Sequence, residues 1–512
     1  MRLYKYILLL LLSGLFACKK SFLSIYPEGQ NNAANFYKST ADFEQALTGT
    51  YAPLRDVANL AFWMDEMRSD NTKYEYNPKD LGSLTTQQLG DFLDDASNPV
   101  ISNRWTADYN GIQRANVILD QLKTISFTMS DSARNQITGE TKALRAHYYF
   151  DLVRCYGGVP LYLHEVQGKS SAFVNRSSVD SVYMQIVSDF TDALGLLSPP
   201  SVFPQSGRVT KGMVATELGL VYLTRKDYPS ASTQLQAVTQ MGYDLLPNYS
   251  DVYTLANKNS KESIFEVQYK AGTDGQQSSF IYRFVPLTTD ATNILGIPYN
   301  SALNTYGGWD VPTPDLVNDY ESGDIRLDAS IAVAKGKLNS GGDYIPDSVT
   351  SILSPSTTGE ISKLFIKKQY HLPYNLVYNT DDNWPLYRYA DVLLMLAEAL
   401  NEQGMSSAAL PYLNKVRSRA GLGAVTVVDQ GQLRTIIAHE RRIELAFENH
   451  RWFDLVRTGQ AIPVMTAFGV IQKATYGYLL PTSYNVTTNR FIYAIPFRET
   501  QVNPGLTQNP GY

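Results

Sequence analysis

Apolar and aromatic residues recur at intervals of three and four along much of this chain, the spacing that places them on one face of an α-helix. The pattern is clear in residues 40–54, 105–122 and 141–153. The last of these stretches runs into Gly157-Gly158-Val159-Pro160, which combines residues that cannot continue a helix. The pattern predicts a mainly α fold.

A repeat of about 34 residues is visible within the helical pattern, as in tetratricopeptide arrays. Residues 213–238 and 393–416 fit the same frame. Small residues stand where two antiparallel helices must approach closely, namely at Gly219, Ala231, Ala397 and Ala409. Two further helix pairs are predicted, from residues 144–150 with 179–197 and from residues 433–447 with 451–456. Because a single pair cannot bury its apolar face, the pairs are expected to stack as a right-handed tetratricopeptide-like scaffold.

Two stretches break this pattern. Residues 250–383 are rich in Gly, Pro, Ser, Thr, Asn and Tyr, and apolar residues alternate only in short runs such as residues 263–269. Residues 59–99 have a similar composition. We expect long irregular insertions with a few short strands that cover the helical scaffold, and binding residues often lie on such loops.

The N-terminus has the features of a lipoprotein signal peptide. Arg2 and Lys5 precede an apolar run, residues 7–12, that is too short to span a bilayer. The run ends at Leu15-Phe16-Ala17-Cys18, where a small residue before a cysteine suits a lipoprotein signal peptidase. We therefore predict a signal peptide in residues 1–17, lipidation of Cys18 and a tether in residues 18–37. An ordinary secretory peptide with an incidental cysteine is the alternative.

Composition narrows the classes of function. Removal of Arg2 and Lys5 with the signal peptide changes the formal net charge from −5 to −7. A mildly acidic chain without a basic run has no electrostatic footprint for nucleic acid. The chain has two cysteines, so lipidation of Cys18 leaves Cys155 without a disulfide partner. Cys155 is expected to be a buried, inert thiol.

Patterns that predict catalysis are missing from the sequence. His439-Glu440 begins like a zinc protease motif but lacks the second histidine, and the five histidines are dispersed. The chain therefore predicts no catalytic residue, metal site or cofactor. The densest group of acidic residues is interleaved with arginines at helical spacing, which favours an ion-pair lattice; it comprises Glu440, Glu444 and Glu448 with Arg441, Arg442 and Arg451. A glycosidase needs only two carboxylates, so the sequence leaves that alternative open.

The five tryptophans fall into two groups. Trp105, Trp384 and Trp452 lie in helical sequence and are predicted to be core residues. Trp63 and Trp309 lie in loop-like sequence, where an indole ring can stack on a sugar while neighbouring polar groups bind its hydroxyls; packing beneath a loop is the alternative. A shared site requires the segment after Ser250 to fold back over the loop after Leu54. The candidate ligand-binding residues are Trp63, Asp65, Asp70, Asn71, Tyr74, Tyr76, Tyr306, Trp309 and Asp310.

Four motifs in the chain resemble one family. They are GETKALRAHYYFDLVRCYGGVPL (residues 139–161), WPLYRYADVLLMLAEALNEQG (384–404), AHERRIELAFENHRWFDLVRTG (438–459) and IPFRETQVNPGLTQNPGY (495–512). In sequence and order they are similar to those of the SusD/RagB family of outer-membrane nutrient-binding lipoproteins. The resemblance implies a helical N-terminal region (38–249), a loop-rich insertion (250–383) and a helical C-terminal region (384–512).

The resemblance also implies a function. Family members are glycan-binding lipoproteins without catalytic activity that face the exterior of the outer membrane and deliver oligosaccharide to a SusC-like TonB-dependent transporter. A peptide ligand is the alternative within the family. A lipid-anchored glycoside hydrolase and a tetratricopeptide adaptor that binds protein segments are the alternatives outside it.

Overall fold

The computed structural model describes residues 36–78, 84–298, 307–355 and 359–512. The predicted signal peptide, Cys18, the tether up to residue 35 and the candidate Tyr306 lie outside the described residues. Within the described part of the chain, no helix is both long enough and apolar enough to cross a bilayer.

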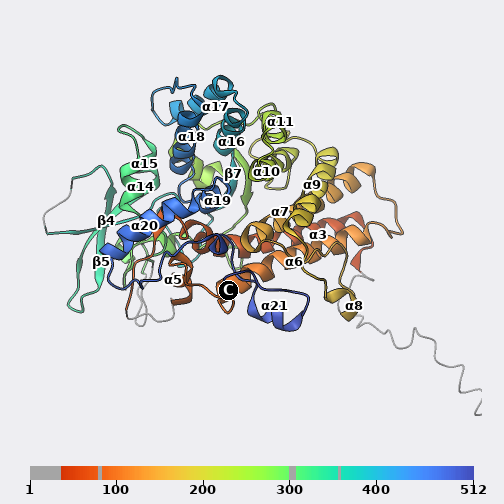
Figure 1. Cartoon of the computed structure of the whole chain (residues 1–512), viewed down its shortest axis with the longest axis horizontal. Helices are drawn as coiled ribbons and strands as arrows, with labels where there is room; N and C mark the ends of the chain where they lie inside the picture. Colours follow the sequence, from red (N-terminus) through yellow and green to blue (C-terminus); the bar gives the residue numbers. More distant parts are fainter. Residues whose placement is uncertain (1–35, 79–83, 299–306, 356–358) are drawn as a thin grey trace, which may run out of the picture.

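The first helical layer is formed by the N-terminal half of the chain (Figure 1). The longest helix, α7, packs lengthwise against both α6 and α9, as the periodicity predicted. Ser130 caps its N-terminus by accepting from the Ala133 amide, and Gly157 ends it with a positive φ of 75°. The helices of this layer are α3 (Thr40–Tyr51), α4 (Pro53–Ala61), α6 (Pro99–Gln121), α7 (Asp131–Tyr156) and α9 (Val179–Leu196).

The repeats predicted from the sequence form antiparallel pairs. At the α10–α11 contact, a Cβ atom on Gly219 would lie 2.7 Å from Leu235 Cγ, so the two helices approach more closely than a side chain permits. Ala231, Ala397 and Ala409 are fully buried at the equivalent contacts. The pairs are α10 (Lys211–Thr224) with α11 (Tyr228–Val238) and α16 (Tyr389–Glu402) with α17 (Ser406–Arg419). The prediction of a tetratricopeptide-like scaffold is confirmed.

The predicted fourth pair is wrong. Helix α18 (Gln430–Glu444) packs on α16 and α17, whereas α19 (Arg451–Arg457) packs on the N-terminal turn η3 (Phe62–Glu66) and on α20 (Ala461–Thr475). The chain between α18 and α19 passes through Phe447 and Asn449, whose φ angles are 68° and 67°. This left-handed backbone directs α19 away from the repeat stack.

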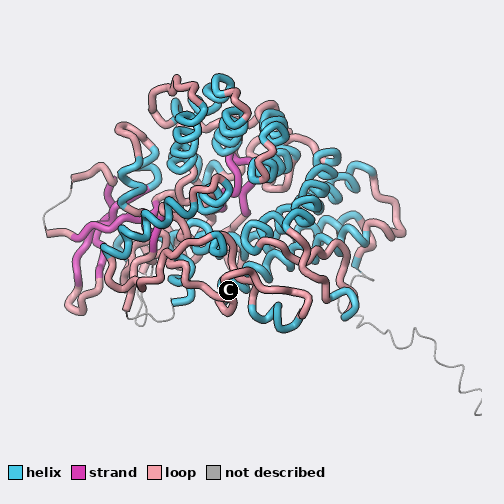
Figure 2. Tube along the Cα trace, in the orientation of Figure 1, coloured by secondary structure: helices cyan, strands magenta, loops and turns pink. Residues whose placement is uncertain are grey.

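The insertion contains a small sheet besides its irregular segments. Figure 2 shows strands gathered at one end of the molecule, where β4 lies between β5 and β6 in an antiparallel sheet. A second pair, β2 with β7, joins the insertion to the C-terminal repeats. The strands are β2 (Ser263–Val267), β4 (Ile331–Leu338), β5 (Tyr344–Ser351), β6 (Ile361–Ile366) and β7 (Trp384–Arg388).

Short elements complete the fold. The N-terminal loop adds β1 (Thr72–Lys73) and α5 (Leu84–Gly90), and α8 (Lys169–Ala172) follows α7. The C-terminal segment adds η7 (Thr488–Arg490) and α21 (Phe497–Val502). The insertion adds η5 (Tyr249–Tyr253), η6 (Leu255–Asn257), α12 (Ile281–Phe284), α13 (Thr292–Leu295), β3 (Val311–Pro312), α14 (Pro314–Asp319) and α15 (Arg326–Ser330).

The predicted core residues are buried. Trp105, Trp384 and Trp452 are 4%, 1% and 1% exposed, which confirms their assignment to the core. Cys155 is a buried free thiol, and burial raises its pKa well above the usual range. The thiol is therefore held in its unreactive protonated form.

The predicted ion-pair lattice exists, but its partners differ from the prediction. Residues one or two apart on a helix do not face each other, so Arg442 points away from Glu440 and Glu444, and Arg441 points away from Glu440. Arg441 instead binds Asp391 (2.6 Å), and Arg442 binds Asp70 (3.0 Å). The buried glutamates pair with cations from other elements: Glu440 with Arg326 and Arg417, Glu444 with Arg326, Arg388 and Arg419, and Glu448 with Arg388 and Lys368.

We predict that Glu444→Gln lowers the free energy of unfolding at neutral pH by about 3–5 kcal/mol, because buried guanidinium groups lose a shared anion. Burial acts to raise the pKa of Glu444, but Arg419, Arg388 and Arg326 outweigh it and lower the pKa to about 2. Such a group stabilises the fold above its unfolded pKa of about 4.3, and this contribution disappears as pH falls toward 2.

Urea unfolding at a series of pH values measures both effects. Wild type should lose stability below about pH 4.5, and Glu444→Gln should lose less over the same range. Glu360, whose ion pair with Lys335 is long (3.8 Å) and partly exposed, provides the control variant Glu360→Gln. An equal loss of stability in the two variants would contradict the prediction.

Candidate functional site

Trp63 is presented by a π-helical turn, η3, and not by a loop as the sequence suggested. Asp65 in this turn points inward and binds Arg104 through both oxygens, at 2.7 and 2.8 Å. Glu66 also points inward and accepts hydrogen bonds from the backbone amides of Phe447 (3.0 Å) and Asn449 (2.9 Å). These anchors leave Trp63 half-buried on the outer side of a rigid turn. Single π turns of this kind are frequent at functional sites.

Trp309 is brought to the same place by pairing between the insertion and the N-terminal loop. Strand β3 pairs with β1, and the Thr72 hydroxyl donates to Asp310 Oδ1 (2.8 Å). The Trp309 amide donates to the carbonyl of Arg283 (3.1 Å). Gly307, with φ of 67°, is required here, because a Cβ atom would lie 1.9 Å from the Val285 carbonyl oxygen. The insertion therefore folds back over the loop after Leu54, as a shared site requires.

The two indoles belong to a larger cluster of rings, which we call the aromatic array. The rings of Trp63 and Trp309 are 5.9 Å apart and nearly perpendicular, at 74°. The contacts continue from Trp309 to Tyr74 (6.3 Å), then to Tyr478 (5.8 Å), which stacks on Tyr76 at 4.3 Å. The members of the array are Trp63, Tyr74, Tyr76, Trp309, Tyr378, Tyr476 and Tyr478.

Two cations lie on the array. The Arg283 guanidinium is 5.7 Å from the Trp63 ring and 5.9 Å from the Tyr378 ring, so it connects these two members. At the other end, Lys73 Nζ is 3.8 Å from the centre of the Tyr476 ring. Such positions are favourable for cations because aromatic faces carry negative electrostatic potential.

Sequence reasoning missed Arg283, Tyr378 and the two C-terminal tyrosines. Tyr476 and Tyr478 flank Gly477 directly after α20, a loop-like signal that marks exposed aromatics but does not connect them with Trp63. Tyr378 lies in a tight turn with φ of 56° and is 38% exposed. Nothing in the local sequence relates these residues to segments that lie hundreds of positions away.

The predicted hydroxyl-binding side chains have a structural role instead, which corrects the prediction. Asp65, Asp70, Asn71 and Asp310 are all at most 3% exposed. Asp70 binds Arg451 through both oxygens (2.8 and 2.9 Å), and Asn71 accepts from Arg442 (3.0 Å). Because burial without a partner is costly, these groups are held by internal contacts and cannot reach a ligand.

Tyr74 and Tyr76 differ in accessibility. Tyr74 is 4% exposed, and its hydroxyl donates to Asp91 (2.8 Å), so it supports the array from below. Tyr76 is 42% exposed and presents its ring to solvent. The accessible part of the array is therefore formed by Tyr76 and Tyr378 together with the half-buried Trp63, Trp309, Tyr476 and Tyr478.

The carboxyl groups beneath the array differ in charge. Burial raises the pKa of Asp310 well above its ordinary range, with further contributions from Glu66 and Asp65. Burial likewise raises the pKa of Asp91 to about 7. Burial also acts to raise the pKa of Asp70, but Arg451 and Arg442 outweigh it and lower the value. Asp310 and Asp91 are therefore biased toward the neutral form.

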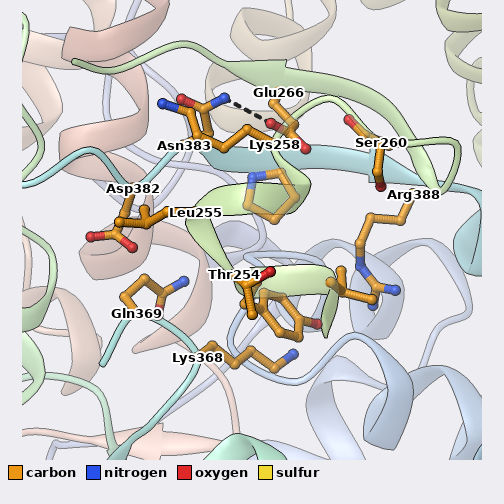
Figure 3. Close-up of a pocket in the computed structure, with 14 residues that line it drawn as sticks. Thr254, Leu255, Lys258, Ser260, Glu266, Lys368, Gln369, Asp382, Asn383 and Arg388 are labelled. Atoms are coloured by element: carbon orange, nitrogen blue, oxygen red, sulfur yellow. Dashed lines mark hydrogen bonds between the residues drawn. The ribbon is translucent and has the colours of Figure 1, made fainter. Parts of the chain in front are cut away.

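The pocket shown in Figure 3 is too small for a sugar. It has a volume of about 30 Å³, which holds little more than one or two water molecules. Its polar walls bind each other: Asn383 Nδ2 donates to Glu266 Oε2 (2.7 Å), and Lys368 pairs with Glu448 (2.8 Å). This pocket is a structural feature of the junction between insertion and repeats.

A larger pocket, of about 460 Å³, lies between α6 and α21. Its aromatic walls include Tyr109 and Tyr162, whose hydroxyls already donate to the carbonyls of Pro160 (2.9 Å) and Ala172 (2.7 Å). Asn110, Gln113 and Glu499 also line this pocket, but its one tryptophan, Trp105, is only 4% exposed and offers little surface for a sugar to stack on. The aromatic array is the better candidate for a glycan site.

Comparison with known proteins identifies the family. Residues 261–512 match the model of the SusD family, and residues 26–223 match a model described as starch-binding associating with outer membrane. The two matches together cover most of the chain. The chain belongs to the SusD/RagB family.

Relatives match over the full length. The chain is 29% identical to SusD-like protein P2 of Formosa agariphila, with all of both chains covered. It is 23% identical to the starch-binding protein SusD of Bacteroides thetaiotaomicron, over 78% of this chain and 76% of that protein. A solved structure of a laminarin-binding SusD-like protein superposes with a TM-score of 0.73 at 29% identity, covering 93% of this chain and 100% of that one.

We predict that Asp310→Asn changes the free energy of unfolding at about pH 5 by less than about 1 kcal/mol, because a neutral amide replaces a carboxyl group that favours its protonated form. Asp70→Asn should cost about 3–5 kcal/mol at the same pH, because it removes the anion between Arg451 and Arg442. Chemical unfolding of the two isosteric variants measures both values. Similar losses would show that Asp310 is ionised in the fold.

Proposed function

We propose that the protein is a surface-exposed lipoprotein that binds an oligosaccharide at the aromatic array and delivers it to a partner TonB-dependent outer-membrane transporter. The observation that most directly supports this proposal is that Trp63 and Trp309 lie together on one rigidly supported surface. The two rings contact each other although their segments lie far apart in the sequence. A hydrogen bond between Thr72 and Asp310, which are 238 positions apart, joins these segments. The laminarin-binding relative supports a glycan as the ligand.

The chemistry of the array suits a sugar ring. Indole and phenol faces cover the apolar C–H face of a pyranose, and rings with two rotatable bonds lose little entropy when they bind. The supporting side chains are locked by buried ion pairs such as Asp65–Arg104 and Asp70–Arg451, so binding needs little rearrangement. A few stacking contacts give moderate affinity, which suits a protein that must release its ligand to a transporter.

The same geometry argues against a hydrolase. A glycosidase requires two carboxyl groups that flank the glycosidic bond. Next to the array, Asp65, Asp70 and Asp310 are buried and engaged in internal contacts. Binding without bond cleavage therefore fits these residues better.

The membrane anchor rests on the N-terminal sequence. Family membership associates the protein with the outer membrane. An acyl chain contributes about 0.8 kcal/mol for each methylene buried in the bilayer, so several chains on Cys18 would hold the protein permanently. A transporter partner follows from the family resemblance, and a lid over a barrel buries on the order of 2,000 Å² or more.

We predict that Trp63→Ala and Trp309→Ala each weaken binding of a laminarin oligosaccharide by about tenfold or more, since each removes a stacking surface of about 1.5–3 kcal/mol. Isothermal titration calorimetry measures the affinity. The free energy of unfolding should fall by less than the about 3–5 kcal/mol expected for a fully buried tryptophan.

Phe497→Ala provides the matched control, because Phe497 is 55% exposed on α21, outside the array. It should leave both affinity and stability unchanged. Loss of stability without a separate loss of affinity would show that Trp63 or Trp309 is a packing residue. Unchanged affinity in both tryptophan variants would place the ligand elsewhere.

We predict that Cys18→Ala moves the protein from the membrane to the soluble fraction, because the acylated thiol is its anchor. Fractionation followed by immunoblotting measures the distribution. Affinity purification of the wild-type protein from detergent extracts should also recover a transporter in near-stoichiometric amount. A variant that stays with the membrane would contradict the anchor, and recovery of free monomer alone would contradict the stable transporter complex.

A further inference from the structure

We infer that the ligand of the aromatic array is an anionic oligosaccharide, and that Arg283 is the residue that recognises its negative group. The inference rests on the proposed function and specifies the substrate class of that site. It is based on three observations. The Arg283 guanidinium forms no ion pair with a described residue, the carboxyl groups near it are engaged or buried, and a second cation, Lys73, lies on the same aromatic array.

The first observation is that Arg283 has no counter-ion among the described residues. None of their ion pairs includes its guanidinium, which lies over the rings of Trp63 and Tyr378. The fully buried arginines of the described fold are bound by carboxylates, often through two oxygens, as Arg104 is by Asp65. A half-buried guanidinium therefore retains donors that can bind a carboxylate or a sulfate group in a planar fork.

The second observation is that nearby carboxylates are engaged elsewhere. Glu75, which follows β1 and donates its amide to the Gly308 carbonyl, binds Lys363 through its side chain. Asp65, two residues after Trp63, is held by Arg104. Asp310, next to Trp309, is buried and biased toward its neutral form. None of these three carboxylates is thus placed to neutralise Arg283.

The third observation is a second cation at the other end of the array. Lys73 lies over the Tyr476 ring and donates a hydrogen bond to its hydroxyl, and it takes part in no ion pair among the described residues. The protein as a whole carries a negative formal charge of −5, so two uncompensated cations on one aromatic surface are a local reversal of sign. A neutral glycan would leave these charges unpaired, whereas a glycan with spaced negative groups pairs them.

The carboxylates of uronic acids and the sulfate groups of sulfate esters can both bind a guanidinium. Matched pairs of charged and neutral probes distinguish these two kinds of negative group. Laminarin is compared with chemically sulfated laminarin, and oligogalacturonate with its methyl-esterified form, so that each pair shares one glycan backbone and differs chiefly in charge. In at least one pair we expect the charged probe to bind about tenfold or more tightly, the effect of one charge-assisted hydrogen bond. The difference should shrink when the ionic strength is raised to about 0.5 M.

Variants assign the effect to Arg283. Arg283→Gln should remove most of the preference for the charged probe, because only Lys73 then remains on the array, and Arg283→Lys should keep a larger part of the preference. Arg498→Gln, which removes an exposed arginine on α21, is the control and should change nothing. Thermal unfolding of each variant confirms that the fold is intact.

The outcomes separate this inference from the proposed function. Equal affinity within both probe pairs, or a preference that is undiminished in Arg283→Gln, would overturn the inference. If neutral laminarin still bound in a manner that depended on Trp63, the proposed function would stand. Binding of no probe, or binding that Trp63→Ala and Trp309→Ala leave unchanged, would overturn both.

Discussion

Buried guanidinium–carboxylate pairs between distant segments are the interaction on which the rest of this structure depends. Arg388 illustrates the principle: it leaves β7 and binds Glu262, Glu444 and Glu448, which come from the insertion, α18 and the segment after α18. Such pairs add little net stability compared with apolar packing of the same volume. Their effect is on specificity, because any other arrangement of the segments leaves charges buried and unpaired.

The same device positions the aromatic array. Arg104 holds Asp65 and thereby the turn that carries Trp63, while Arg451 holds Asp70 and thereby the strand that pairs with the segment of Trp309. Helices α6 and α19, the turn η3 and the insertion are thus fixed to one another beneath the rings. A binding surface assembled from loops is rigid here because its loops end in buried ion pairs.

The scaffold was predictable from sequence because helical periodicity and small residues at close contacts are local signals. Gly219 and Ala397 marked helix pairs that the structure contains. The fourth pair was mispredicted because the left-handed backbone at Phe447 and Asn449 redirects the chain, and phenylalanine, unlike asparagine, rarely adopts that conformation. The π turn at Trp63 was missed for a related reason, since its geometry is imposed by distant partners of Asp65 and Glu66.

Within the candidate site, the aromatic residues were easier to predict than the polar ones. A tryptophan in loop-like sequence is a candidate for an accessible ring, and Trp63 and Trp309 do meet as half-buried side chains. An aspartate beside it gives no such indication, because its accessibility depends on whether an arginine hundreds of residues away reaches it. Asp70 binds Arg451 and has a structural role. Arg283 forms no ion pair with a described carboxylate and can bind a ligand instead.

This difference suggests how a common scaffold can acquire different ligands. Any mispairing would leave charges buried without a partner, so the buried ion pairs constrain where the array lies. The charge presented on the array depends instead on which arginines and carboxyl groups remain outside that network. In this chain, burial of Asp310 and Asp91 in forms biased toward neutrality removes negative charge from beneath the rings, and Arg283 and Lys73 set the sign of the surface.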